Sequence, residues 1–204
     1  MSGQGELFDG NEKIEVSPDD SLEAILNELK ASPCGACKPG MPLIFGEGPV
    51  SPQFMLIGEG AGIDDVGPQR PFQGPSGVML NRMMGSIGVA VRDCYTTNVI
   101  KCIPPRERNF STEEIEACRP FLLRQIYAVH PKLIIAFGAL AAQTLLRTKL
   151  SISNLRGRVF DLAINEHHMI LVPTFNPAYL LRVPEKKREA WEDLKLVREL
   201  RRGL

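Results

Sequence analysis

The chain has 204 residues, 44% of them hydrophobic, and its formal net charge at pH 7 is zero. This length and composition suit one globular domain with a sizeable core and argue against two domains. Apolar runs such as Leu133–Phe137 fall far short of the ~20 residues that a membrane helix needs, and no signal peptide opens the chain. We therefore expect a soluble intracellular protein without a membrane partner.

The charge is divided unevenly along the chain. Residues 1–66 contain 3 Lys/Arg and 12 Asp/Glu, which leaves 21 Lys/Arg and 12 Asp/Glu in the remainder. Because affinity for nucleic acid depends on local rather than total charge, the later segment can carry a phosphate-binding face. Solvated helix faces explain the same surplus equally well.

Residues 1–18 lack apolar periodicity, so we expect a flexible tail, followed by one domain over residues 19–204. The tail contains the residues Gln4, Leu7 and Phe8 in the pattern Gln-x-x-Leu-Phe. This pattern resembles short peptides that bind bacterial sliding clamps, in which two apolar side chains enter a groove. A sliding clamp is therefore a candidate partner. A helix is predicted next, capped near Ser17 to Asp20 and running to about Leu29.

Four of the five cysteines form two pairs, Cys34-x2-Cys37 and Cys102-x15-Cys118. Thiolates at such spacings bind zinc or iron–sulfur clusters, and the residues alone leave both metals open. An odd number of cysteines in an intracellular protein argues against a disulfide framework. Cys94 is then the free thiol.

Four apolar runs predict strands at residues 53–57, 95–100, 133–137 and 169–174. Helices are predicted at residues 77–87, 112–129, 139–146 and 185–202, the second opened by a capping box of Ser111 and Glu114. In the last helix, Trp191, Leu194, Val197 and Leu200 form a stripe expected to face the core. The alternation predicts an α/β fold: a three-layer α/β/α sandwich around a central, mainly parallel four-stranded sheet.

Several motifs follow the predicted strands, where such sheets bind their ligands. The first strand is followed by Gly58-Glu-Gly-Ala-Gly-Ile-Asp-Asp65 and then by Arg70-Pro-Phe-Gln-Gly74. The second ends on Thr97-Asn-Val-Ile-Lys-Cys102, and the fourth on Pro173-Thr-Phe-Asn-Pro-Ala-Tyr-Leu-Leu-Arg182. Glycines at the first turn would let backbone amides approach a ligand closely.

These motifs suit a flat ring with hydrogen-bonding edges. Phe72 could stack on such a ring, and the Asn98 amide could pair with one donor and one acceptor. A pyrimidine extruded from DNA meets both requirements. Leu180 could then fill the gap left in the duplex, while Arg182 binds a backbone phosphate.

The five motifs, in this order, resemble those of the family 4 iron–sulfur uracil-DNA glycosylases. They are Gly-Glu-(Gly/Ala)-x-Gly, Arg-Pro-Phe-x-Gly, Thr-Asn-Val-x-Lys-Cys-x-Pro-Pro, Cys-x15-Cys and Pro-Thr-Phe-x-Pro-x-Tyr-Leu-Leu-Arg. The resemblance extends from about Cys34 to Arg182. It implies an enzyme of the prokaryotic cytosol that acts as a monomer on uracil-containing DNA.

The resemblance also implies roles for individual residues. Cys34, Cys37, Cys102 and Cys118 would hold a 4Fe-4S cluster. Uracil would contact Gly58, Gly60, Phe72 and Asn98, and the catalytic residues would be Glu59, Asp65 and Asn176, with Asp65 favoured for stabilising the sugar cation or positioning water. Arg106 and Arg108 would contact phosphates, or else lie on a solvated loop.

Four positions depart from the family pattern. Ala61 replaces the proline of the first motif, Asp65 replaces a glutamate, Asn176 replaces the catalytic histidine, and Ala178 replaces a serine whose hydroxyl could contact a phosphate. An amide nitrogen can still donate to uracil O2, but it cannot carry a positive charge. Removing one good donor from such a site costs ~3 kcal/mol, about a hundredfold in rate. We therefore expect a slow glycosylase.

Two alternatives remain open. The chain could be a catalytically weak protein that binds damaged DNA, or a glycosylase for another deaminated base such as hypoxanthine, because Asn-Pro pockets of related glycosylases accept broader substrates. The loop Arg106-Glu-Arg-Asn109 lacks the histidine with which one relative captures the sugar covalently. We therefore expect no covalent intermediate.

Overall fold

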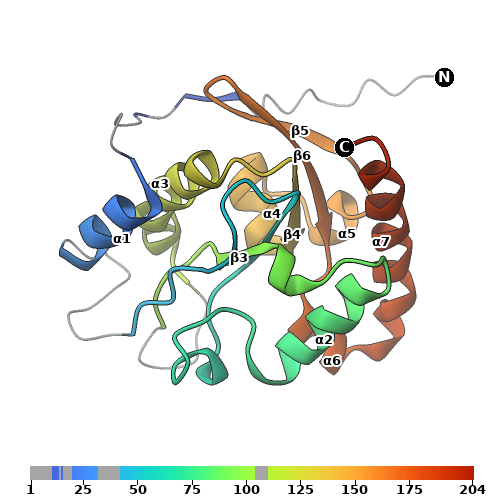
Figure 1. Cartoon of the computed structure of the whole chain (residues 1–204). Coiled ribbons are helices and arrows are strands. Elements are labelled where there is room, and N and C mark those ends of the chain that lie inside the picture. The colour runs from blue at the N-terminus through green and yellow to red at the C-terminus, as the bar shows by residue number, and fades with distance from the viewer. Residues whose placement is uncertain (1–10, 14, 16–19, 32–41, 104–109) are drawn as a thin grey trace.

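A computed structural model describes residues 11–13, 15, 20–31, 42–103 and 110–204 (Figure 1). The described part forms one sheet in the order β1-β5-β6-β4-β2-β3. Its strands are β1 (Asn11–Glu12), β2 (Phe54–Gly58), β3 (Tyr95–Asn98), β4 (Leu133–Phe137), β5 (Phe160–Ile164) and β6 (His167–Thr174). β2, β3, β4 and β6 pair in parallel, whereas β5 runs antiparallel to β6.

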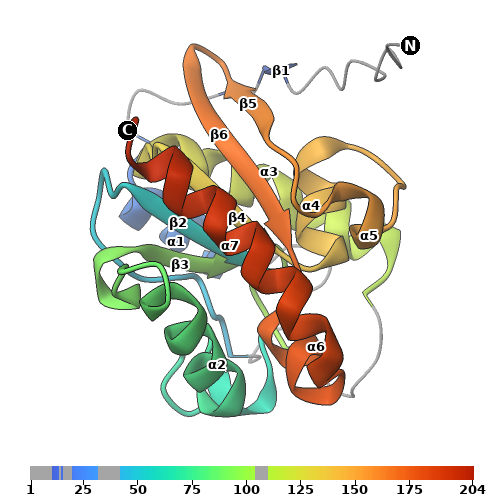
Figure 2. The same cartoon turned by 90° about the vertical axis from the view of Figure 1, so that its right-hand side faces the viewer.

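Helices cover both faces of the sheet. They are α1 (Leu22–Ala31), α2 (Gly74–Gly85), α3 (Thr112–Val129), α4 (Ala139–Leu146), α5 (Ile152–Leu155), α6 (Pro177–Arg182) and α7 (Lys187–Arg201), with short 3-10 turns η1 (Ile63–Asp65), η2 (Val91–Asp93) and η3 (Pro184–Lys186). In Figure 1, α1 and α3 lie on one side of the sheet and α2 and α7 on the other. Figure 2 shows α7 crossing in front of the strands. The predicted three-layer sandwich is confirmed.

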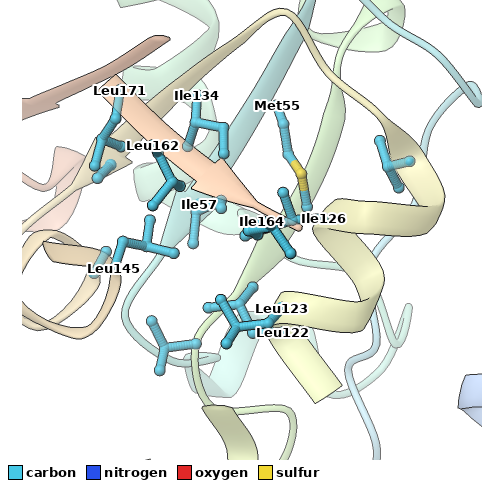
Figure 3. Packing of buried hydrophobic residues seen from close by; sticks show 14 of the residues in the cluster. Met55, Ile57, Leu122, Leu123, Ile126, Ile134, Leu145, Leu162, Ile164 and Leu171 are labelled. Carbon is cyan, nitrogen blue, oxygen red and sulfur yellow. The ribbon is translucent and has the colours of Figure 1, made fainter. Parts of the chain in front are cut away.

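The strands are buried on both faces, which explains their continuous apolar sequences. Alternate residues of a strand point to opposite faces. Met55 and Ile57 accordingly pack with α3, whereas Phe54 and Leu56 pack with α2 and α7. Figure 3 shows the first of these cores, where side chains of α3 approach those of β2 and β4. Two separate apolar cores therefore fix the sheet between its helical layers.

The four predicted strands are present, as are helices over residues 112–129 and 139–146 with their predicted bounds. The capping box of α3 is confirmed: Ser111 N donates to Glu114 Oε2 at 2.8 Å, and Glu114 N donates to Ser111 Oγ at 3.3 Å. The strand number was wrong, because the sheet as described also contains β5 and the two-residue β1. β1 lies within the segment predicted to be a flexible tail.

The predicted inward stripe of the last helix is correct only in part. Leu194 and Val197 are buried, but Trp191 is 36% exposed. Ala190, one residue earlier, is buried in its place. None of the helices in the described part of the chain has the length and apolar content needed to cross a membrane.

Candidate active site

The predicted site residues meet at the carboxyl ends of β2, β3 and β6. These strands are parallel, so their ends lie along one edge of the sheet, and Gly58 is the register partner of Asn98. Figures 1 and 2 place this edge at the end of the molecule that also carries α2 and α6. The turns that leave the strands therefore lie close together at this edge of the sheet.

Gly58 lies directly against the side chains of Asn98 and Phe72. A Cβ atom placed on Gly58 would lie 2.3 Å from Asn98 Oδ1 and 2.7 Å from Cζ of Phe72. Real Cβ atoms essentially never come that close to other atoms, so only glycine allows the amide and the ring to lie together over this strand end. The Phe72 ring also packs edge-on against Phe137, with ring centroids 6.1 Å apart. The structure thus brings together three of the residues predicted to contact uracil.

Phe72 has an unusual backbone conformation. Its φ of 57° lies in the left-handed region, which bulky residues rarely adopt. Gly77 is necessary for this geometry, because a Cβ there would lie 1.8 Å from the Phe72 carbonyl oxygen. Such conformations persist where the surrounding structure enforces them, and they are concentrated at functional sites. The backbone therefore supports a binding role for Phe72.

Asn98 carries a polar atom without a partner. Its side chain is 2% exposed, and Nδ2 is buried without a hydrogen bond to any described residue. Its backbone is held firmly: Lys101 Nζ donates to the Asn98 carbonyl oxygen at 2.6 Å and to Gln125 Oε1 at 2.6 Å. An unsatisfied buried donor costs about 1–3 kcal/mol, which makes this amide a candidate for binding a ligand.

Glu59 directly follows Gly58, and its carboxylate accepts a hydrogen bond at each oxygen. Oε1 accepts a hydrogen bond from Leu140 N in the first turn of α4 at 2.9 Å, and Oε2 accepts one from Asn176 Nδ2 at 3.1 Å. Burial raises the pKa of Glu59, although these hydrogen bonds and the positive charge of Arg182 oppose the shift. The result is a partly buried, oriented carboxylate at the N-terminus of a helix.

Asn176 makes contacts that its sequence position did not reveal. Its Oδ1 accepts a hydrogen bond from Ala178 N at 2.9 Å, which caps α6. Its Nδ2 donates to Glu59 and makes a longer contact of 3.5 Å with the Phe137 carbonyl oxygen. The amide predicted to donate to uracil O2 is therefore directed at Glu59 in the free protein.

Asp65, the favoured catalytic carboxylate, is 4% exposed. It joins the two ends of the loop that connects β2 to α2: Oδ2 accepts from Gly62 N at 2.9 Å, and Oδ1 accepts from Gln73 N at 2.7 Å. Burial raises its pKa, while these backbone donors act in the opposite direction. In this geometry Asp65 stabilises the loop that carries Phe72.

Leu180 was predicted to enter the DNA duplex, but the structure places it in the core, where it is 1% exposed. It packs with the apolar residues of α2 and α7, so it has no free surface to insert. The next residue, Leu181, is 41% exposed, and Arg182 beside it is also exposed. The insertion of Leu180 into DNA stays a prediction, and in this conformation Leu181 is the exposed apolar side chain of α6.

A buried ion pair that the sequence did not predict lies behind the Asn176 loop. Asp193 of α7 is 1% exposed and accepts hydrogen bonds from Arg156 Nε at 3.0 Å and from Thr174 Oγ1 at 2.6 Å. The Arg156 guanidinium also lies over the Phe175 ring, 5.3 Å from its centroid. These contacts fix the end of β6 immediately before Asn176.

Two of the four predicted metal ligands lie in the described part, and both are buried: Cys102 is 1% exposed and Cys118 is 0% exposed. Leu43 forms an antiparallel bridge with Cys102, which brings the chain that follows the first cysteine pair alongside the second. Cys34, Cys37, Arg106 and Arg108 lie outside the described residues, as do Gln4, Leu7 and Phe8.

Cys94 is set apart from these ligands. It is buried in the second core, and burial raises its pKa to about 12. A thiol with such a pKa is protonated at neutral pH and unreactive.

Comparison with known protein families identifies the family to which this chain belongs. The family model described as "Uracil DNA glycosylase superfamily" matches residues 45–195. The chain belongs to the uracil-DNA glycosylase superfamily. The matched segment contains Gly58, Phe72, Asn98 and Asn176, so the site lies within the part that defines the superfamily.

Among individual glycosylases, the chain is similar to type-4 proteins over most of its length. It is 31% identical over 186 residues to the type-4 uracil-DNA glycosylase of Archaeoglobus fulgidus, covering 89% of this chain and 94% of that protein. It is 34% identical over 181 residues to that of Thermotoga maritima, covering 86% and 92%. A type-5 enzyme of Pyrobaculum aerophilum matches over only 60 residues. The predicted membership of family 4 is confirmed.

Proposed function

We propose that this protein removes uracil from DNA by hydrolysing the bond between the base and deoxyribose, the first step of base excision repair. The observation that carries the proposal is the close contact of Gly58 with the Phe72 ring and with the Asn98 amide, whose Nδ2 has no hydrogen-bond partner among the described residues. Uracil offers a flat ring, an O4 acceptor and an N3–H donor. These groups match the ring, the Nδ2 donor and the Oδ1 acceptor of the site.

The reaction breaks the bond between C1′ and N1, and the bonding electrons leave with uracil. The sugar then gains positive charge at C1′, water adds there as a hydroxyl group, and the proton that water loses neutralises the departing uracil anion. Glu59 is the carboxylate that we assign to stabilising this cation, because it is oriented at both oxygens and is more exposed to solvent than Asp65. A fixed charge of this kind needs no reorganisation during the reaction.

Asn176 sets the rate in this proposal. Its amide orients Glu59, so its capacity to donate to uracil O2 is limited. We therefore retain the expectation of a slow enzyme. The same observation favours the second candidate, a protein that binds uracil-containing DNA without turnover.

One assay separates the two candidates. Purified protein is incubated with a uracil-containing oligonucleotide, and abasic sites are then cleaved with alkali. Strand cleavage that depends on the uracil supports the glycosylase. Selective binding without cleavage at enzyme excess supports the damage-binding protein, and a parallel hypoxanthine substrate tests the base range.

We also propose that Cys34, Cys37, Cys102 and Cys118 hold a 4Fe-4S cluster. The burial of Cys102 and Cys118 fits a cluster shielded from solvent, and the Leu43–Cys102 bridge supports the approach of the first pair. The hydrolysis requires no electron transfer, so the cluster would hold the loop between Cys102 and Cys118. Anaerobically purified protein should be brown and contain about four iron atoms. Colourless protein with stoichiometric zinc would contradict this assignment.

Contacts with DNA are assigned to the exposed end of α6, with Leu181 filling the duplex and Arg182 binding a phosphate. Arg106 and Arg108 are proposed as further phosphate contacts, and the pattern of Gln4, Leu7 and Phe8 as a clamp-binding peptide. The two arginines and the three residues of the clamp-binding pattern lie outside the described part of the chain.

Replacing Leu181 by alanine should slow uracil release from duplex DNA by about tenfold and leave single-stranded substrate almost unaffected. The reason is that only a duplex has a gap to fill after the base is extruded. Single-turnover rates on matched duplex and single strands measure this difference. Val159→Ala is the control, because Val159 is similarly exposed at 45% but lies immediately before β5. If Leu181→Ala lowered the rate equally on both substrates, Leu181 would not be the residue that fills the gap in the duplex.

A further inference from the structure

A contact between Gly60 and Phe110 joins the turn after β2 to the segment between Cys102 and Cys118. A Cβ on Gly60 would lie 2.5 Å from Cζ and 2.6 Å from Cε2 of the Phe110 ring. The backbone of Gly60 lies outside the left-handed region, so conformation does not require glycine there. A Cβ on Gly62, two residues later, would have no neighbouring atom within 4 Å. Glycine at position 60 is therefore explained by the Phe110 ring.

The Phe110 side of the contact is firmly held. Phe110 immediately precedes Ser111, whose capping box with Glu114 begins α3, and α3 carries the buried Cys118. The ring is partly buried against the core formed by α1, α3 and α4, and Ile100 lies 3.7 Å from the same Gly60 position. The ring therefore has little freedom to move away from Gly60.

The Gly60 side of the contact leads directly to the chemistry. Glu59 is the preceding residue, and its carbonyl oxygen accepts a hydrogen bond from Ile100 N at 3.0 Å. Its side chain is held on the other side by Leu140 and Asn176. A planar peptide bond joins Glu59 to Gly60, so a displacement of Gly60 moves Glu59 as well.

We infer that Phe110 is a positioning residue, which holds the catalytic turn by packing its ring on the bare Cα of Gly60. The inference rests on the proposed function, in which Glu59 stabilises the sugar cation. Phe110, which lies between Cys102 and Cys118 in the sequence, would then help to hold the catalytic residues in place. Misplacing a reacting group by about 1 Å can cost about a hundredfold in rate, so the contact should be visible in kcat.

The test is a double-mutant cycle on a uracil-containing single-stranded oligonucleotide. Gly60→Ala should lower kcat by about thirtyfold with KM changed less than about twofold, because the new methyl group displaces the ring and the turn. Phe110→Ala should lower kcat by about tenfold. The double variant should be about as active as Phe110→Ala, and so about threefold more active than Gly60→Ala alone, because the methyl group then occupies space that the ring has vacated.

Gly67→Ala is the matched control. Gly67 lies in the same connection between β2 and α2, has open space around it, and should retain wild-type activity. Melting temperatures of all variants exclude general unfolding as the cause of a loss. Additive effects in the double variant, or wild-type kcat in Gly60→Ala, would overturn the inference. Absence of uracil release by the wild-type protein would instead overturn the proposed function.

Discussion

Replacing Glu59 by glutamine is expected to lower the rate of uracil release by about a thousandfold. A carboxylate about 4 Å from a developing unit charge contributes about 4 kcal/mol at an effective dielectric constant of about 20. Glutamine keeps an acceptor for Leu140 N but loses the negative charge. Single-turnover kinetics on a uracil-containing oligonucleotide measure the chemical step directly.

The pH dependence of the rate should identify the same group. Burial raises the pKa of Glu59 above its ordinary value of 4.5, so the carboxylate becomes protonated at a higher pH than an exposed glutamate. The ionised form is the active one. The wild-type rate should therefore rise with pH through this raised pKa, and Glu59→Gln should lack that ascending limb.

Asp65→Asn is the control for the Glu59 substitution. Asparagine has one carbonyl oxygen in place of the two acceptors that bind Gly62 N and Gln73 N, so the loop should lose stability. The cost should be about 1–3 kcal/mol of unfolding free energy, with a smaller loss of rate than for Glu59→Gln. If Asp65→Asn lost more activity than Glu59→Gln, Asp65 rather than Glu59 would be the carboxylate that stabilises the sugar cation.

The second large effect is expected at Asn98. Asn98→Leu should lower kcat/KM by about a hundredfold or more, because the side chain that reads the base edge is lost. The same change should raise stability, since it removes a buried Nδ2 that has no partner among the described residues. A gain of about 1 kcal/mol raises Tm by about 2–4 °C in a chain of this size. Calorimetry and single-turnover assays on the same preparation measure both effects.

Thr144→Val provides the comparison for Asn98. The Thr144 hydroxyl is also buried without a partner in the described structure, but it lies within α4 away from the site. This variant should gain stability and keep its activity. If Asn98→Leu destabilised the protein and preserved activity, Asn98 would be a structural residue. A gain in stability with loss of activity is the expected signature of a binding group kept unsatisfied for its ligand.

Local sequence was sufficient to predict most elements. The apolar run of β4 and the capping box of α3 are short-range signals, and both elements have their predicted bounds. β5 was missed because it is a five-residue strand interrupted by the exposed Asp161. It is stabilised by its antiparallel pairing with β6, which follows directly after a turn. Tertiary pairing, rather than local propensity, determines this strand.

Long-range contacts in the site were beyond sequence reasoning. Glu59 and Asn176 are 117 residues apart, and only the converging strand ends bring their side chains together. The sequence also did not predict that Leu180 is buried and Leu181 exposed, for a simpler reason. Adjacent residues of a helix point about 100° apart, and α6 is too short to reveal its buried face by periodicity.

Phe72 already holds its left-handed backbone in the free protein, so the ring is available to uracil without a conformational search. The strain of such a residue, about 1–3 kcal/mol, lowers the stability of the fold and leaves base binding unaffected. Entry into the pocket is then limited by extrusion of the base from DNA. Because a base in single-stranded DNA needs no unpairing, association should be faster with single strands than with duplexes.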